Sequence, residues 1–117
     1  MILVIAIFIS FVAGIFSGLL GIGGGLILVP FFHYLLKMNM HQAIGTSLVI
    51  IIPTALAGAI RYASEHAVDW RIVLLAVLFS IAGALLGSSV SLQLDVTFLR
   101  KIFAVFLVLV AIKMFLQ

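Results

Sequence analysis

Four glycines within five positions form the first group of residues that can bind a ligand. They lie in the otherwise apolar stretch GLLGIGGGLILVP (residues 18–30), which also contains a proline: Gly21, Gly23, Gly24, Gly25 and Pro30. Glycine breaks helices, and a helix that restarts after the break presents N–H donors and a partial positive charge at its first turn. In membranes, discontinuous helices aim such ends at anionic groups. The run can therefore form an anion site from peptide groups alone; the alternative is a tight turn at the membrane surface.

Hydroxyl groups in the stretch HQAIGTSLVIIIPTALAG (residues 41–58) form the second group. Gly45, Thr46 and Ser47 come one or two turns inside an expected helix, where a hydroxyl bonds either to ligand oxygens or to a carbonyl of the preceding turn. Pro53 has no N–H donor and so leaves one carbonyl free, with Thr54 beside it. We predict that Gly45, Thr46 and Ser47 bind a ligand together with the glycine run, and Pro53 and Thr54 are further candidates.

The histidines offer little catalytic or metal chemistry. His33, three residues after Pro30, can bind an anion when protonated, although an interfacial position beside Tyr34 and Lys37 is the favoured interpretation. The three histidines are scattered and the chain has no cysteine, so we expect no metal site and no cofactor. No nucleophile is paired with a base, so we predict no catalytic residue and no enzyme activity.

The acidic residues restrict the kind of ligand. Glu65, Asp69 and Asp95 are the only carboxylates, and all three fall in expected loops. Carriers of protons and cations usually need a carboxylate within the membrane. Its absence from the apolar segments argues against a cation or drug exporter and agrees with an anionic ligand.

The composition shows that membrane helices must position these residues. The chain has 117 residues, of which 67% are hydrophobic and 8% charged, with a mean hydropathy of +1.53. A soluble domain of this size cannot bury so much apolar surface. An uncharged helix over residues 2–36 would be about 52 Å long against a hydrocarbon core of about 30 Å, so it must break, and the glycine run is the place.

The sequence therefore predicts an all-α integral membrane protein with four to five transmembrane helical segments and a glycine-broken helix near its N-terminus. The expected helices are 2–20, 25–37, 40–61, 71–93 and 98–116. The second is short and either spans the membrane or dips in and returns. Gly14 with Gly18, and Gly83 with Gly87, have the small-x-x-x-small spacing that lets membrane helices pack closely.

Basic residues are balanced across the expected membrane. Three fall on each side: Lys37, Arg100 and Lys101 on one, and Arg61, Arg71 and Lys113 on the other. The positive-inside rule therefore sets no orientation. Two alternatives remain: another signal guides insertion, or the protein has dual topology, in which copies insert in both orientations and pair antiparallel. The net charge of +3 is scattered, which suits lipid headgroups and gives no surface for nucleic acid.

Two motifs follow each other in the first half of the chain. The first is G-x-G-G-G-x-x-x-x-P at residues 21–30, and the second is A-x-G-T-S-L at residues 43–48. In this order they resemble the TauE/SafE sulfite-exporter family of membrane transporters. The segments AGALLGSSVSLQL (82–94) and RKIFAVFLVLVAIKMF (100–115) continue the likeness. The resemblance implies transport of a small sulfur-containing anion, such as sulfite or an organosulfonate, by a multi-pass protein of a bacterial or archaeal plasma membrane.

The resemblance also implies how much of a transporter this chain represents. Members of that family are usually about twice as long and contain two related halves, so residues 1–117 are expected to form a single transmembrane domain equivalent to one half. We then expect a homodimer, antiparallel if one copy is inverted, that binds a small anionic substrate and works by alternating access. The alternatives are a small dual-topology anion channel, which GAIRY (58–62) faintly resembles, a non-transporting membrane subunit, or a shortened gene product.

Overall fold

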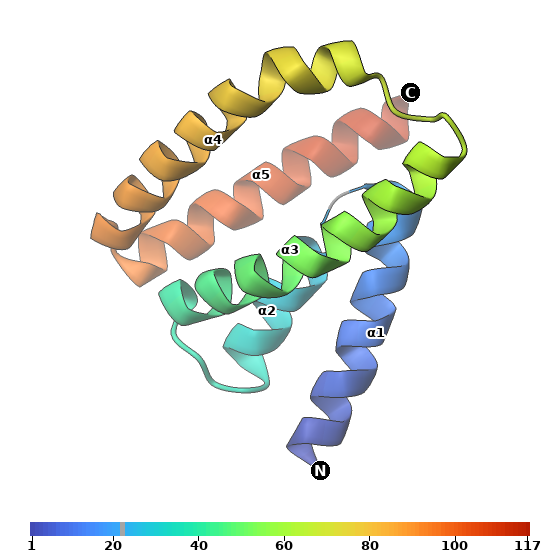
Figure 1. Cartoon of the computed structure of the whole chain (residues 1–117). Coiled ribbons are helices and arrows are strands. Elements are labelled where there is room, and N and C mark those ends of the chain that lie inside the picture. The colour runs from blue at the N-terminus through green and yellow to red at the C-terminus, as the bar shows by residue number, and fades with distance from the viewer. Residues whose placement is uncertain (22) are drawn as a thin grey trace. The chain divides into compact units, whose positions relative to one another are not determined.

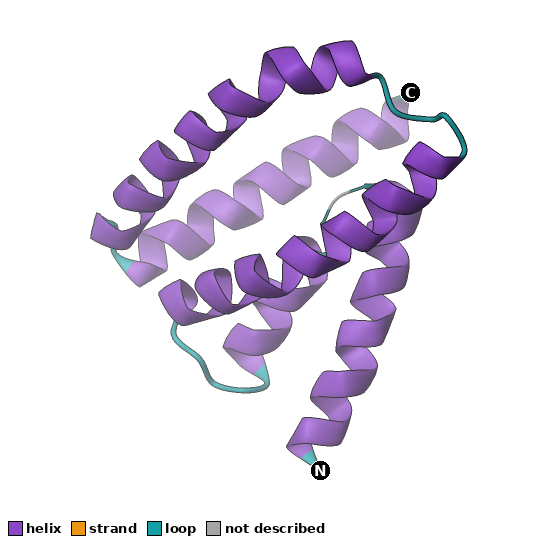
Figure 2. Ribbon diagram, in the orientation of Figure 1, coloured by secondary structure: helices purple, strands orange, loops and turns teal. Residues whose placement is uncertain are grey.

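The chain is almost entirely helical (Figure 1, Figure 2). The computed structural model describes residues 1–21 and 23–117, and these ranges contain five helices and no strand. The helices are α1 (Ile2–Leu20), α2 (Gly25–Tyr34), α3 (Met40–Ser64), α4 (Trp70–Gln93) and α5 (Val96–Leu116). The predicted all-α fold and the break in the helix near the N-terminus are confirmed.

Three of the described helices, α1, α3 and α4, are long and apolar enough to cross a membrane. Helix α5 has 21 residues, but Arg100, Lys101 and Lys113 interrupt its apolar character. Helix α2 has 10 residues, so its length of about 15 Å covers only half of a hydrocarbon core of about 30 Å. The described helices therefore support a multi-pass membrane protein, in which α2 by itself is too short to cross the bilayer.

Helix α2 ends at Tyr34, before the predicted residue 37, because the chain turns sharply there. Lys37 has a φ of 57°, a left-handed conformation through which a helix cannot continue. The N–H of Met38 donates to the Phe32 carbonyl at 3.1 Å and closes the turn. Asn39 caps α3, because its side chain accepts a hydrogen bond from the N–H three residues later at 2.9 Å.

Contacts within the chain define two units, residues 1–78 and 79–117. The second unit contains the later part of α4 and all of α5, and none of its residues is buried. A Cβ atom added at Gly83 or Gly87 would meet nothing within 4 Å. The close packing that the spacing of these two glycines predicts is therefore not made within this unit.

The first unit has a small core where α1, α2 and α3 contact one another (Figure 1). Its buried side chains come from all three helices: Ala13 and Ser17 from α1, Leu28, Val29 and Phe32 from α2, and Met40, Ala43 and Ser47 from α3. Alanine and serine on α1 and α3 let the helix backbones approach closely, as is common in membrane helices. This core fixes the start of α2 between two long helices.

Candidate functional site

The glycine run ends α1 and begins α2 in a backbone conformation that other residues rarely adopt. Gly21, Gly23 and Gly24 have φ values of 70°, 76° and 78°, in the left-handed region that favours glycine. The Gly21 N–H donates to the Ser17 carbonyl at 2.8 Å and closes the last turn of α1. Ile22, also in the run, lies outside the described residues. Glycine is required here for the direction of the backbone as well as for its small size.

The first N–H groups of α2 are the part of the glycine run that the sequence predicts to bind an anion. No described residue accepts a hydrogen bond from the N–H groups of Gly23, Gly24, Gly25 or Leu26. These groups carry the partial positive charge of a helix N-terminus. Anion binding at this end of α2 stays a prediction, which this partial positive charge supports.

Helix α2 begins beside the middle of α3. A Cβ atom added at Gly23 or Gly25 would lie 3.5 Å from the side chain of Ile51, near the midpoint of the 25-residue α3. On the other side, a Cβ atom at Gly24 would lie 3.4 Å from the carbonyl oxygen of Ala13 in α1. The N-terminus of α2 therefore lies deep between the two long helices, and α2 covers only the first half of α3.

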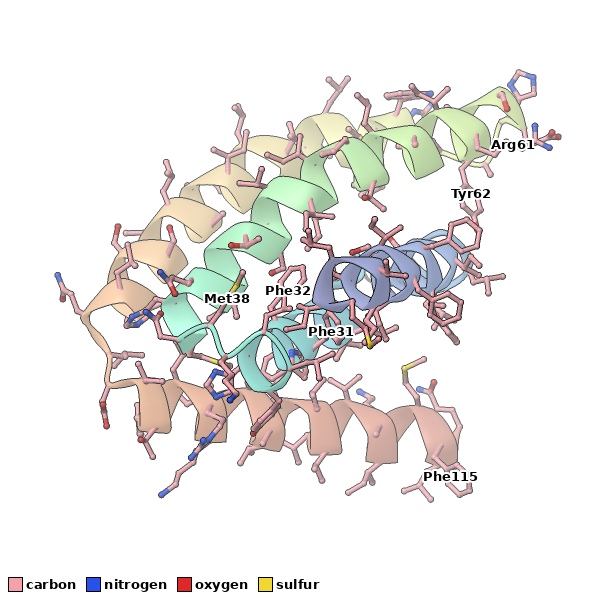
Figure 3. The ribbon with its side chains drawn as sticks, turned by 90° about the horizontal axis from the view of Figure 1, so that it is seen from below. Phe31, Phe32, Met38, Arg61, Tyr62 and Phe115 are labelled. Atoms are coloured by element: carbon pink, nitrogen blue, oxygen red, sulfur yellow. The ribbon has the colours of Figure 1, made fainter. Side chains whose placement is uncertain are left out.

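A pocket of about 240 Å³ lies along the other half of α3. The end of α1, the glycine run and α3 form its lining: Ser17, Gly18, Gly21, Gly23, Thr54, Ala55, Gly58, Ala59 and Tyr62. A water molecule accounts for about 30 Å³ of liquid, so the pocket has room for a small ion and several waters. Figure 3 shows Tyr62 reaching from α3 toward α1, where its hydroxyl donates to the Gly18 carbonyl at 2.7 Å.

Three hydroxyl groups of α3 direct their protons at backbone carbonyls. Thr54 donates to the carbonyl four residues earlier at 2.8 Å, and Ser47 donates to the carbonyl three residues earlier at 2.8 Å. Tyr62 donates to the Gly18 carbonyl. A hydroxyl has a single proton, so in this arrangement each of the three offers only its oxygen lone pairs to a ligand.

Some of the predicted binding residues come together at the pocket. Gly21, Gly23 and Thr54 line it. Gly24 is buried against α1 and Gly25 packs on α3, so these two residues hold the start of α2 in place and do not line the pocket. The glycine run and Thr54 therefore line the same pocket. From the sequence alone, Thr46 and Ser47 are the favoured ligand-binding residues and Thr54 is only a further candidate.

The other predicted binding residues lie away from the pocket. Gly45 is exposed, Thr46 is half-buried, and Ser47 is 1% exposed in the core beside α2. Pro30 is half-buried inside α2 and Pro53 is exposed on α3. None of these five residues lines the pocket.

Ser17 and Tyr62 are lining residues that the sequence did not single out. Ser17 is 7% exposed, and no described residue accepts a hydrogen bond from its hydroxyl. A signal for Ser17 was available, since a small polar residue one turn before a glycine that ends a helix lies beside the break. Tyr62 gave no such signal, because its hydrogen-bond partner is 44 positions away in the sequence.

His33 holds the loop between α2 and α3. Its Nδ1 lies 2.9 Å from the Met38 carbonyl oxygen and must donate to it, and its ring packs edge-on against Tyr34 with centroids 4.8 Å apart. His33 does not line the pocket. Among the described residues, no three histidine or carboxylate side chains are grouped so that they could hold a metal ion.

Comparisons with known proteins give a consistent result. The family model described as sulfite exporter TauE/SafE matches residues 5–117. Probable membrane transporter protein YunE of Bacillus subtilis (strain 168) is 29% identical over 97% of this chain and 44% of its own length. Probable membrane transporter proteins of Haemophilus influenzae and Xylella fastidiosa (strain 9a5c) are 33% and 35% identical over 98% and 86% of this chain, and over 46% and 39% of their own lengths. No solved structure matches the chain significantly.

The chain spans less than half the length of these curated relatives. The family match nevertheless covers almost all of the chain, including the glycine run and the A-x-G-T-S-L motif at residues 43–48. The resemblance stated from these two motifs is confirmed. The chain belongs to the TauE/SafE sulfite exporter family of membrane transporters.

Proposed function

We propose that this protein transports a small anion, sulfite or an organosulfonate, across the plasma membrane of a bacterium or archaeon. The family and the names of the relatives support a membrane transporter. One observation carries the assignment of an anion. The N–H groups that begin α2 have no described acceptor, and they lie beside the middle of α3 next to a pocket of about 240 Å³.

The chemistry at this helix end favours a small oxyanion. The first N–H groups of α2 can donate to its oxygens, and the helix dipole adds a partial positive charge that is effective where water is scarce. No acidic side chain is among the pocket-lining residues described here. Pockets for drug-sized ligands usually exceed about 300 Å³, so a pocket of 240 Å³ suits an ion of few atoms.

We further propose that two copies of the chain form the complete path. The chain spans 44% of YunE and 46% of the Haemophilus relative, so two copies match the length of one relative. The small-x-x-x-small stripe at Gly83 and Gly87 suits close packing of helices between copies. The balanced basic residues permit antiparallel pairing, and alternating access would open the pocket to one side at a time.

Uptake into proteoliposomes tests this function. We expect the purified chain to run as a dimer by light scattering, and to give saturable uptake of labelled sulfite or ethanesulfonate above that of protein-free liposomes. Each anion should compete with the other, because both present negatively charged oxygens on sulfur to the same N–H groups. Uptake equal to that of protein-free liposomes for both anions would contradict the proposal, and large currents that do not saturate would identify a channel instead.

Replacing His33 by phenylalanine separates loop stability from anion binding. The variant keeps an aromatic ring but loses the hydrogen bond to the Met38 carbonyl, which contributes about 1 kcal/mol. We expect a lower melting temperature in detergent and unchanged uptake per folded molecule. Reduced uptake at an unchanged melting temperature would instead give His33 a direct role with the anion.

A further inference from the structure

The wall of the pocket formed by α1 and α3 has the chemistry of a cation site. Beyond the glycine run, its polar groups are the hydroxyls of Ser17, Thr54 and Tyr62 and the backbone of Gly18. All of these present oxygen atoms. We propose that this wall binds a monovalent cation of the sodium class, next to the anion site at the start of α2.

The directions of the hydroxyl protons support a cation more than a second anion. Thr54 and Tyr62 both donate to backbone carbonyls, at 2.8 and 2.7 Å. Their remaining lone pairs are acceptors, and an anion against them would be repelled. A cation is attracted by the same lone pairs, as it is by the carbonyl oxygens of ion-selective channels and of unwound transporter helices.

Ser17 adds an independent observation. The residue is 7% exposed, it lines the pocket, and none of the described residues accepts a hydrogen bond from its hydroxyl. No buried side-chain oxygen or nitrogen of the described residues lacks a hydrogen-bond partner, so the unpartnered Ser17 oxygen is accessible and can meet water or an ion in the pocket that Ser17 lines. A cation in the pocket would take the Ser17 oxygen as one of its ligands.

The C-terminal end of α1 adds an electrostatic field that favours a cation. The last four carbonyls of a helix have no intrahelical donor and carry its partial negative charge. Two of these carbonyls in α1 have partners, since Ser17 accepts from the Gly21 N–H and Gly18 accepts from Tyr62. The carbonyl of Gly18 keeps a second lone pair, because a carbonyl oxygen accepts two hydrogen bonds.

The lack of formal charge in the lining selects a monovalent ion. The nine residues that line the pocket include no Asp, Glu or His. Calcium and magnesium sites in proteins depend on carboxylates, and neutral oxygens alone do not offset the loss of water from a divalent ion. Neutral oxygens do suit an alkali cation, whose hydration is weaker.

The two ions would stabilise each other. The α2 end of the pocket attracts the anion and the α1 end attracts the cation, so opposite charges meet in a space that is small and partly dry. A role of the cation in coupling rests on the proposed anion transport, but cation binding itself does not. The two are therefore tested by separate measurements.

Cation binding is measured first, without substrate. We expect sodium chloride to raise the melting temperature of the purified chain in detergent more than potassium chloride or choline chloride at equal ionic strength. Thr54→Val and Ser17→Ala each remove one oxygen ligand, and we expect the apparent sodium affinity to fall about tenfold in each. Thr97→Val, at an exposed position of α5, removes a hydroxyl that is not among the pocket-lining residues and should leave the sodium effect unchanged.

Equal stabilisation by the three chlorides would overturn the cation site, as would sodium stabilisation that survives in both Thr54→Val and Ser17→Ala.

Uptake measurements then test coupling: we expect an inward sodium gradient to accelerate uptake of labelled sulfite, and Thr54→Val to weaken that acceleration. If sodium raises the melting temperature but the rate of sulfite uptake does not depend on sodium, the cation site is supported and its role in coupling is contradicted. Absence of uptake in every salt would contradict the transport function, while the melting data would still decide the cation site.

Discussion

Anion uptake through the Gly24→Leu variant is expected to fall to the level of protein-free liposomes. Gly24 has a φ of 78°, and residues with a Cβ atom lose roughly 1–2 kcal/mol in this left-handed region. An added Cβ atom would also lie 3.4 Å from the carbonyl oxygen of Ala13, and the rest of a leucine side chain has no room beside buried Ala13. The start of α2 must therefore move, and its first N–H groups are displaced from their position beside the pocket. Uptake of labelled sulfite per folded molecule measures the effect.

Gly14→Ala is the matched control. Gly14 lies inside α1 with no neighbour within 4 Å of an added Cβ atom, so a methyl group fits there and favours the helix. We expect normal uptake and an unchanged or higher melting temperature. If Gly24→Leu stays folded and transports at the wild-type rate, the glycine run is not the anion site.

Filling the pocket should stop transport without unfolding the protein. Gly58 lines the pocket, and a Cβ atom added there would meet nothing within 4 Å. We expect Gly58→Phe to place its ring in the 240 Å³ space, to reduce uptake to background, and to leave the melting temperature close to that of the wild type. This substitution is expected to change transport without changing stability, whereas most residues near the pocket also form the core, so that their substitution would change both.

Ala57→Phe tests whether the effect comes from the pocket or from bulk on α3. Ala57 is exposed and is absent from the pocket lining, although it is next to Gly58 in the sequence. We expect this variant to transport normally. Loss of uptake in both variants would assign the effect to helix packing, and normal uptake in Gly58→Phe would exclude the pocket from the transport path.

Much of the fold follows from length and composition. The uncharged stretch over residues 2–36 is too long for one span, and glycine is the residue that allows a break, so α1 and α2 were predictable as separate helices. The end of α2 was less predictable. It depends on the left-handed turn at Lys37, which no glycine or proline marks in the sequence.

The position of the pocket could not be obtained in the same way. Ser47, Ile51 and Thr54 follow the spacing that places residues on one face of a helix, so either hydroxyl can face the glycine run. The structure decides between them because Gly23 and Gly25 pack on Ile51. Helix α2 then covers the turn that carries Ser47 and leaves the turn that carries Thr54 open.

Long-range contacts are the second reason why the site was only partly predictable. Tyr62 is exposed at the end of α3, and nothing in its sequence neighbourhood distinguishes it from an interfacial tyrosine. Its role depends on the carbonyl of Gly18, which becomes a neighbour only when α1 and α3 pack together. Backbone acceptors of this kind are present in every sequence and identify no position until the chain is folded.

The start of α2 beside Ile51 also has an electrical consequence. On the transport path proposed above, with α3 spanning the bilayer, an ion that enters the pocket from one surface would cross about half of the membrane before it meets α2. Moving one elementary charge through the full potential changes its energy by about 2.3 kcal/mol per 100 mV, so this partial path corresponds to about 1.2 kcal/mol. Occupancy by a singly charged anion alone therefore varies with voltage. Occupancy by that anion together with a monovalent cation transfers no net charge and is electroneutral.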